Sequence, residues 1–273
     1  GFALQGWLGE PLGAAGCALS NVLVAWLACS SGALYLAFGP LGARYRPFAN
    51  WARPRWATWR ELLRLGVPMG LSNLVEITSF TLISLFVASL GATVVAGHRI
   101  VANLSALIYM LPLSLAIATM AALGQAVGAR DRERERLTVR AGLVLAAGSS
   151  SLVGLLLWLM AGPVVAAYTD DPAVRLVAVG LVGYVALYQF FDALQTVAGH
   201  CLRAYRVTFL PMLVQTFCFW GVGLLGGAWL CYRWTPPMGV AGFWLASVLS
   251  LVGAAALLLP LLRQATRGAE RVL

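Results

Sequence analysis

The sequence predicts an all-α membrane protein with about seven transmembrane helices. Three observations support this fold class. The 273 residues are 60% hydrophobic and only 11% charged, and their mean hydropathy is +0.83, which is too apolar for a soluble domain. Apolar runs near the length that spans a bilayer, roughly 20 residues, recur along the whole chain. Arginine residues are concentrated in alternate connections between these runs.

The apolar runs define the predicted helices in order. They cover residues 14–38, 66–90, 99–127, 140–166, 173–201, 207–232 and 239–262. Asp170 and Asp171 before Pro172 form a helix start signal, which places the beginning of the fifth helix. We divide the chain into an outer loop with the first helix (1–49), a linker (50–65) and a six-helix lobe (66–273). The linker mixes tryptophan with arginine, which favours an amphipathic helix in the headgroup zone over a solvated connection.

The distribution of charge predicts the orientation. All 19 basic residues are arginine, and the net charge is +9. Sixteen arginines follow the first, third, fifth and seventh helices, and the other three lie in the intervening loops. The positive-inside rule therefore predicts a cytoplasmic C-terminus, an outer N-terminal segment and a multi-pass protein of the inner (cytoplasmic) membrane. Because the arginines follow a membrane rule, we expect the lipid bilayer as a partner and no nucleic acid.

An internal repeat links the first helix to the last. Residues 11–23 (PLGAAGCALSNVL) and 237–249 (PMGVAGFWLASVL) align without gaps, and seven of the thirteen positions are identical. Chance similarity between Gly/Ala-rich helices is the alternative. If the first helix is equivalent to the seventh, the chain holds the end of one repeat and one complete second repeat. Two repeats in the same orientation are typical of two-lobe transporters, so we expect about twelve helices in the intact protein.

Four segments resemble the second half of multidrug and toxic compound extrusion (MATE) transporters, particularly their bacterial NorM-like branch. They are LRLGVPMGLSNLVEITSFTLISLFVASLG (63–91), GHRIVANLSALIYMLPLSLAIATMAALGQAVGA (97–129), YQFFDALQTVAGHCLRAY (188–205) and PMGVAGFWLA (237–246). The resemblance covers nearly the whole chain. It implies the last helix of a first lobe and a whole second lobe, so we expect a missing N-terminal lobe in the intact chain. It also implies a secondary active transporter that exports small-molecule organic cations, or drugs, in exchange for Na⁺ or H⁺.

Two acidic residues, Glu76 and Asp192, lie well inside the predicted spans. The other eight acidic residues lie in loops, at helix ends or in the tail. An ionised side chain at membrane depth costs at least about 2.5 kcal/mol, so such residues usually face a cavity, a partner or a proton. Arginine is absent from the interior of both helices. We therefore expect no static salt bridge to either acid within the chain.

Each acid shares a helix face with other polar or aromatic residues at steps of three and four. One face carries Tyr184, Tyr188, Asp192, Gln195 and Gly199, and the other carries Asn73, Glu76 and Phe80. Two such stripes indicate neighbouring helices that line a common cavity. The candidate lining residues are therefore Asn73, Phe80, Tyr184 and Gln195.

The two carboxyl groups suggest a carrier mechanism. Burial disfavours the charged form of a carboxyl group, whereas a bound cation favours it. A proton or Na⁺ and a cationic drug would then compete for the same negative charge. The resemblance implies, through the motifs VEITSF and YQFFDALQ, that Glu76 and Asp192 bind the coupling cation and that Tyr188 assists. The alternative is a pair of neutral acids that pack helices together, with Tyr188 as an ordinary packing residue.

Weaker signals concern histidine and cysteine. His98 and Asn103 lie near the outer end of the third helix in an H-x-x-x-x-N motif, where we expect them to support the structure rather than carry protons. The five cysteines have no metal-ligand spacing and are expected to act as small apolar residues. We expect no cofactor and no structural metal, only the coupling ion near Glu76 and Asp192.

Three other functions are alternatives to a cation-coupled exporter. An enzyme is disfavoured because the chain lacks a nucleophile elbow, an H-E-x-x-H motif and paired intramembrane aspartates. A lipid-linked oligosaccharide flippase of the same superfamily would need basic residues in its cavity, whereas arginine here is confined to helix ends. A truncated membrane protein without transport is the third alternative, because one complete lobe alone cannot rock against a second.

Overall fold

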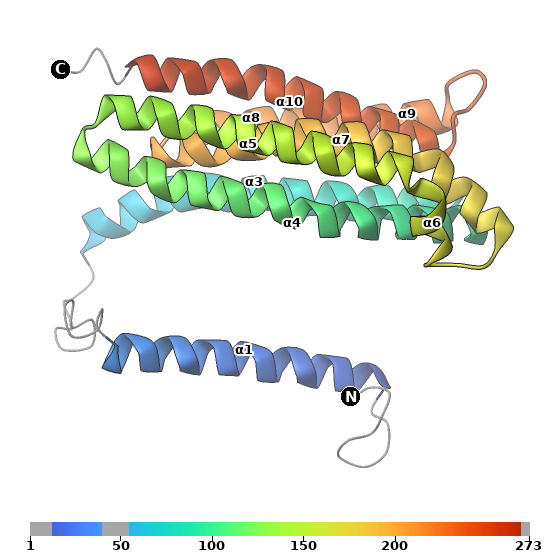
Figure 1. Cartoon of the computed structure of the whole chain (residues 1–273), viewed down its shortest axis with the longest axis horizontal. Coiled ribbons are helices and arrows are strands. Elements are labelled where there is room, and N and C mark those ends of the chain that lie inside the picture. Colours follow the sequence, from blue (N-terminus) through green and yellow to red (C-terminus); the bar gives the residue numbers. More distant parts are fainter. Residues whose placement is uncertain (1–12, 40–54, 269–273) are drawn as a thin grey trace. The chain divides into compact units, whose positions relative to one another are not determined.

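The computed structural model describes residues 13–39 and 55–268 (Figure 1). The described part is helical throughout, with no strand, as predicted. The helices are α1 (Gly13–Phe38), α3 (Trp56–Ala88), α4 (Ala92–Ala129), α5 (Arg132–Leu159), α6 (Ala161–Ala166), α7 (Pro172–Ala204), α8 (Phe209–Thr216), the π-helix η1 (Phe217–Gly226), α9 (Gly227–Tyr232) and α10 (Val240–Gly268). Because α8, η1 and α9 are continuous, seven spans in the described residues are long and apolar enough to cross a membrane. This number confirms the prediction.

Several helix bounds differ from the sequence-based expectations. Helix α3 begins at Trp56, so the second half of the predicted linker continues directly into the membrane helix instead of forming a separate element. The first half of the linker, up to residue 54, lies outside the described residues. The predicted helix 140–166 is interrupted at Met160, which separates α5 from the short α6. Helix α7 begins as predicted: Asp171 is its N-cap and accepts hydrogen bonds from the backbone nitrogens of the next turn.

The chain divides into two units after Trp59. The first unit contains α1. The equivalence of α1 and α10 remains a prediction from the internal repeat.

Helix α7 is the centre of the second unit. It packs against α4, α5 and α10, and the long helices of the unit run alongside one another (Figure 1). Its buried apolar residues form the middle of two core clusters, one around Val185 and one around Val197. Helix α3 contributes Val75, Ile83 and Val87 to buried apolar clusters. The Ser79 hydroxyl of α3 also donates to the backbone oxygen of Phe219 at 3.1 Å. The arrangement puts α3 and α7 beside the same spaces in the lobe.

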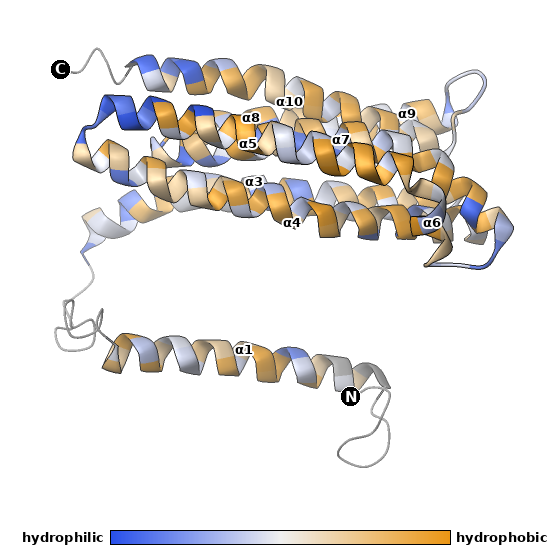
Figure 2. Cartoon of the chain, in the orientation of Figure 1, coloured by the Kyte–Doolittle hydropathy of each residue, from blue (hydrophilic) through white to orange (hydrophobic). Residues whose placement is uncertain are grey.

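The arginine-rich connections of this unit gather at one end of the bundle. Figure 2 shows hydrophilic residues at the end where α5 begins and α10 ends. A buried carboxylate, Glu135, lies there and is bonded by Arg132 through both oxygens, at 3.1 and 3.0 Å. The Tyr205 hydroxyl donates to the same carboxylate at 3.1 Å. Burial raises the pKa of Tyr205 to about 12, and the negative Glu135 acts in the same direction. The phenol therefore stays protonated and able to donate near neutral pH.

Candidate functional site

The structure brings Glu76 and Asp192 into the wall of one cavity. This first cavity has a volume of about 340 Å³ and lies between α3, α4 and α7. Its lining residues are Glu76, Ile77, Phe80, Thr81, Ala102, Ser105, Ala106, Tyr109, Tyr188 and Asp192. Asp192 is 2% exposed and Glu76 is partly buried. The two predicted polar stripes thus face a common space, which makes this cavity the candidate cation site.

A short chain of amides holds the Asp192 side chain. The amide nitrogen of Gln195 donates to Asp192 Oδ1 at 3.0 Å and lies 3.1 Å from Thr196 Oγ1. The amide nitrogen of Gln215, from α8, donates in turn to Gln195 Oε1 at 3.3 Å. All four of these side chains are buried. Because these neighbours are neutral, the carboxylate is oriented without being neutralised.

Aromatic rings form the wall beside the acids. The ring of Tyr188 makes edge-to-face contacts with Phe80 at 5.9 Å and with Trp244 at 6.0 Å between centroids. Tyr188 lies one helical turn before Asp192 on α7. The negative face of an aromatic ring attracts a cation within about 6 Å. The combination of carboxylates and rings therefore suits an organic cation, which needs charge neutralisation and apolar contact together.

A second cavity of about 300 Å³ adjoins the first and shares Glu76, Ile77 and Tyr109 with it. Its wall adds the predicted lining residues Asn73 and Gln195, together with His200 and Arg203 near the end of α7. The cavity region is therefore not purely acidic, which corrects the expectation drawn from the position of arginine at helix ends. Arg203 belongs to the last turn of its helix, yet its side chain lines this space.

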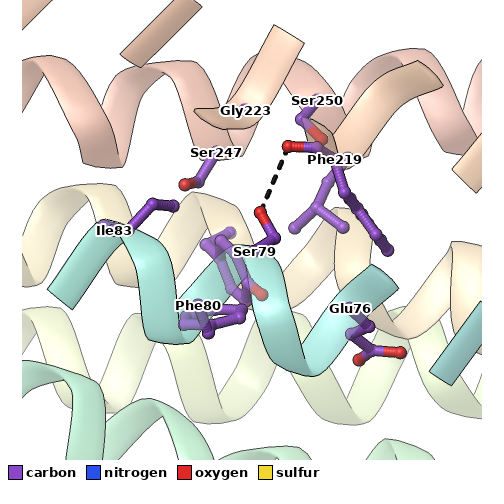
Figure 3. A pocket seen from close by; sticks show the side chains of 10 residues that line it. Glu76, Ser79, Phe80, Ile83, Phe219, Gly223, Ser247 and Ser250 are labelled. Atoms are coloured by element: carbon purple, nitrogen blue, oxygen red, sulfur yellow. Dashed lines mark hydrogen bonds between the residues drawn. The ribbon is translucent and has the colours of Figure 1, made fainter. Parts of the chain in front are cut away.

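Figure 3 shows another, much smaller cavity, which shares Glu76, Phe80 and Tyr188 with the first. Ser79, Ser247 and Ser250 line it together with Phe80 and Phe219, and its volume of about 20 Å³ has room for about one water molecule. The dashed line in Figure 3 marks the bond from Ser79 to the backbone of Phe219, which fixes α3 against η1. In this view the carboxyl group of Glu76 points away from the serines. Glu76 therefore lines this small cavity as well as the first one, with its carboxyl group directed away from the serines.

Three predicted residues lie away from the first and second cavities. Tyr184 packs against the core and is absent from both walls. His98 is buried against Trp244, and its Nε2 lies 3.4 Å from the hydroxyl of Ser84. Asn103 is exposed and accepts a hydrogen bond from the Tyr168 hydroxyl at 3.1 Å. The positions of His98 and Asn103 are compatible with the supporting role expected for them.

Neither acid is paired with an arginine within 4 Å among the described residues. The ion pairs found there join Arg132 with Glu135, Arg175 with Asp170, and Arg206 with Glu61, all in loops or near helix ends. The described residues also contain no group of three or more His, Cys, Asp or Glu side chains placed to hold a metal ion. The two acids in the first cavity therefore remain available to a cation that enters it.

Sequence reasoning missed several residues of these walls. Tyr109 lines both large cavities, and Ser105 and Gln215 contribute from helices to which no polar stripe was assigned. The available signal was Tyr109 itself, a phenol inside the apolar run 99–127. Gln215 is likewise an amide inside the apolar run 207–232, but its relation to Gln195 depends on how α8 packs against α7.

Comparison with known proteins identifies the family. Residues 68–229 match the model of the MatE family. The chain belongs to this family. Because the match covers more than half of the chain and most of the lobe described above, the resemblance drawn from sequence motifs is confirmed. Membership of MatE agrees with a membrane transporter rather than an enzyme.

Similar bacterial proteins carry the name NorM. The chain is 53% identical over 266 residues to a probable multidrug resistance protein NorM of Aromatoleum aromaticum, a match that covers 96% of this chain and 57% of that protein. It is 37% identical over 271 residues to a probable multidrug resistance protein NorM of Chromobacterium violaceum, covering 97% and 57%. The chain thus spans little more than half the length of these relatives.

Solved structures show the same fold. The crystal structure of the eukaryotic MATE transporter AtDTX14 matches with a TM-score of 0.85 and 19% identity, covering 97% of this chain and 60% of that one. A MATE family transporter of the MOP superfamily in an outward-facing conformation matches with a TM-score of 0.81 and 16% identity, covering 95% and 58%. At these identities the likeness concerns the fold, and it supports the predicted multi-pass MATE architecture.

Proposed function

We propose that this chain is part of a multidrug exporter in which Glu76 and Asp192 form a cation site, and that Na⁺ or H⁺ and an organic cation compete for it. The observation that carries the proposal is the first cavity, where two carboxyl groups from α3 and α7 face one space lined by Tyr188, Phe80 and Tyr109. Exchange follows from competition, because the site releases one positive charge when it accepts another.

The two acids have different surroundings, and these suit them to different roles. Asp192 is almost fully buried and oriented by Gln195, so it is suited to binding a small coupling cation tightly. Glu76 is partly buried and lines both large cavities, so a larger ligand can reach it from either side. Tyr188 provides a ring beside Asp192 and contacts Phe80. These features support Tyr188 as the residue that assists cation binding.

The intact transporter is proposed to contain a first lobe before this chain. The relatives named NorM are considerably longer than the matched region, and the equivalence of α1 and α10 suits a two-repeat design. The protein is proposed to lie in the inner membrane with its arginine-rich end and C-terminus in the cytoplasm. Rocking of the two lobes would then expose the cation site to each side in turn.

Substitution of the acids in the intact transporter tests this proposal. Asp192→Asn removes the charge at nearly constant volume and is expected to lower efflux of a cationic dye at least about tenfold, because a buried charge loses its cationic partner. Glu76→Gln is expected to weaken coupling as well. The matched control is Asp170→Asn, which alters a fully exposed loop carboxylate paired with Arg175. Normal efflux by Asp192→Asn in vesicles that contain inserted protein would refute the cation site.

The coupling ion is identified in the same vesicles. A Na⁺ gradient and a pH gradient are imposed separately while the fluorescence of a cationic dye reports its transport. We expect one gradient to drive dye movement and Asp192→Asn to abolish that response. If neither gradient drives transport by the wild-type protein, the proposed antiport is wrong.

A further inference from the structure

Two small cavities continue from the cation site between α3 and α10. The serine cavity is the one drawn in Figure 3, and Glu76 lies in its wall. The histidine cavity has a volume of about 10 Å³ and is lined by Phe80, Ile83, His98, Phe243, Trp244 and Ser247. The two cavities have Phe80, Ile83 and Ser247 in common. Building on the exporter proposed above, we propose that ordered waters in these cavities form a proton path between His98 and Glu76.

Three buried polar atoms at these cavities have no partner among the described residues. They are the hydroxyl oxygen of Ser250 at the serine cavity, and Trp244 Nε1 and His98 Nδ1 at the histidine cavity. The three residues are at most 2% exposed. A polar group buried to this extent is normally satisfied by the protein or by an ordered water. The volumes of about 20 and 10 Å³ each have room for about one water molecule. Unsatisfied polar atoms and space for water therefore coincide.

The polar groups form a column along two antiparallel helices. On α10, Trp244, Ser247 and Ser250 follow one another at steps of three and share one face. On α3, Glu76 lines the serine cavity with Ser250, and Ser84 lies eight residues later, about 12 Å along the helix axis. The end of α3 and the start of α10 lie at the same end of the unit (Figure 1). The column therefore runs from Glu76 toward the end that is poor in arginine.

His98 lies between this column and an open groove. Its Nε2 is 3.4 Å from the hydroxyl of Ser84, and Ser84 lines a groove of about 510 Å³ whose wall also contains Thr81 and Arg99. Arg99, the charged residue of the groove, follows His98 directly on α4. An imidazole ring can take a proton at one nitrogen and give one up at the other, which suits a proton shuttle. The path therefore gives His98 a role beyond the structural support expected from the sequence.

The transfer of one proton is balanced at every group. In the tautomer that carries its proton on Nδ1, His98 accepts a proton from the groove at Nε2 and releases one from Nδ1 to the water beside it. Each water, and each hydroxyl between the waters, gains one proton and loses one. The carboxylate of Glu76 binds the last proton, and a flip of the His98 ring restores the first tautomer.

The path and the transported cation approach Glu76 from different cavities. The carboxyl group of Glu76 is directed away from the serines in Figure 3, so it takes up the proton after rotation about its side-chain bonds. The titratable and charged groups that line the first and second cavities with it are Asp192, Tyr188, Tyr109, His200 and Arg203. A proton can thus reach Glu76 from the serine cavity while an organic cation occupies the first cavity.

The rate of dye release tests the path. Ethidium, a permanent cation, is bound to the intact transporter in nanodiscs, and its release is followed by stopped-flow fluorescence anisotropy. Mixing with excess tetraphenylphosphonium at constant pH gives the spontaneous rate, and mixing with acid gives the rate after a fall in pH. The fall in pH is expected to speed release by about tenfold or more, because a proton that arrives past the bound dye removes the charge that holds it.

Gly223→Ala narrows the path without changing either acid. Gly223 lines the serine cavity, and a Cβ atom there would lie 3.4 Å from the hydroxyl oxygen of Ser250, in the space for water. This variant is expected to release the dye at the spontaneous rate even after the fall in pH. The matched control is Gly221→Ala on the same π-helix, whose Cβ would meet only the ring of Phe217, at 3.7 Å. It should behave as the wild type does. His98→Gln retains hydrogen bonding without proton transfer and should act like Gly223→Ala.

Thermal unfolding tests the water in the serine cavity without any transport. Ser250→Ala is expected to lower the melting temperature, because a hydroxyl bonded to water is lost. The comparison is Ser150→Ala, whose hydroxyl is also buried and unpartnered among the described residues but lines neither small cavity. Loss of a dry, unsatisfied hydroxyl should instead raise the melting temperature. A rise for Ser250→Ala would overturn the water at this place, and the path with it.

The outcomes separate the path from the proposed cation site. Equal rates with and without the fall in pH in the wild type, or the same acceleration in Gly223→Ala and His98→Gln as in the wild type, would overturn the path alone, provided that Asp192→Asn weakens ethidium binding. If Asp192→Asn binds ethidium as tightly as the wild type, the cation site itself is wrong.

Discussion

At the scale of single residues, Asp192 depends on the side chain of Gln195. The Gln195 amide donates to the carboxylate at 3.0 Å, and Gln215 holds the other end of the same amide. An ionised carboxylate in a buried place is stabilised by such donors, and a neutral acid needs them less. Gln195 therefore favours the form of Asp192 that attracts a cation. This positioning role is separate from contact with the transported molecule.

Gln195→Leu is expected to raise the dye concentration needed for half-maximal transport by about tenfold or more. The physical reason is the loss of a hydrogen bond to a charged group, worth about 1.5–3 kcal/mol. Transport kinetics in vesicles measure the effect. The control Gln264→Leu changes an exposed glutamine on α10 and should have no such effect. Unchanged kinetics for Gln195→Leu would indicate that Asp192 is held by other contacts.

The sequence allowed both acids and most of their helix faces to be predicted, because an acid inside an apolar run is conspicuous. Tyr188, Phe80 and Gln195 followed from steps of three and four along one helix. Arg203 did not, since an arginine in the last turn of a membrane helix usually reaches the headgroup zone. Only the position of α3, with Asn73 opposite, directs Arg203 into a cavity. Such a relation spans 130 residues and has no local pattern.

At the scale of secondary structure elements, small residues decide how closely the helices approach. A Cβ atom on Gly242 of α10 would lie 2.9 Å from the backbone nitrogen of Cys231 and 3.0 Å from the backbone carbon of Leu230. Backbone atoms of α9 cannot move aside as a flexible side chain can. Close backbone approach through small residues is the usual way that membrane helices pack. The α9–α10 pair is therefore fixed by Gly242.

Gly242→Ala is expected to lower the unfolding free energy by about 1–3 kcal/mol, as overpacking in a dense interior does. Thermal unfolding in detergent measures the change. Gly253→Ala on the same helix is the control, because its Cβ would meet only Cys218 Sγ, at an ordinary 3.6 Å. Alanine favours a helix over glycine by about 1 kcal/mol, so the control should be neutral or stabilising. Equal stability of the two variants would contradict the close contact.

Helix existence was easier to predict than helix ends. Hydropathy located all seven spans, because each must cover the same bilayer thickness. The continuation of α3 back to Trp56 was missed, since amphipathic composition at 50–65 is equally compatible with a surface helix. The π-helical segment η1 was also missed, because its wider turn leaves no distinct pattern in an apolar run.

At the scale of the whole molecule, charge is distributed unevenly between the two ends of the second unit. The turns that contain Arg130 and Arg206, and the end of α10 with Arg263 and Arg267, lie at one end (Figure 2). The opposite end holds the α3–α4, α6–α7 and α9–α10 connections, with few arginines. This alternation confirms what the sequence predicted about which loops lie together. It leaves the side of the membrane as a prediction.

The positive-inside rule predicts that the arginine-rich end faces the cytoplasm. Green fluorescent protein fused to the C-terminus of the intact transporter should therefore fluoresce, whereas alkaline phosphatase at the same place should be inactive. Phosphatase inserted at Thr169, in the connection between α6 and α7, should be active because that end lies outside. The reverse pattern would place the arginine-rich end, with Arg203 in the wall of the second cavity, on the outer side of the membrane. The reporter experiment thus determines from which side of the membrane a ligand meets the second cavity, lined by Arg203, before it reaches Asp192 in the first.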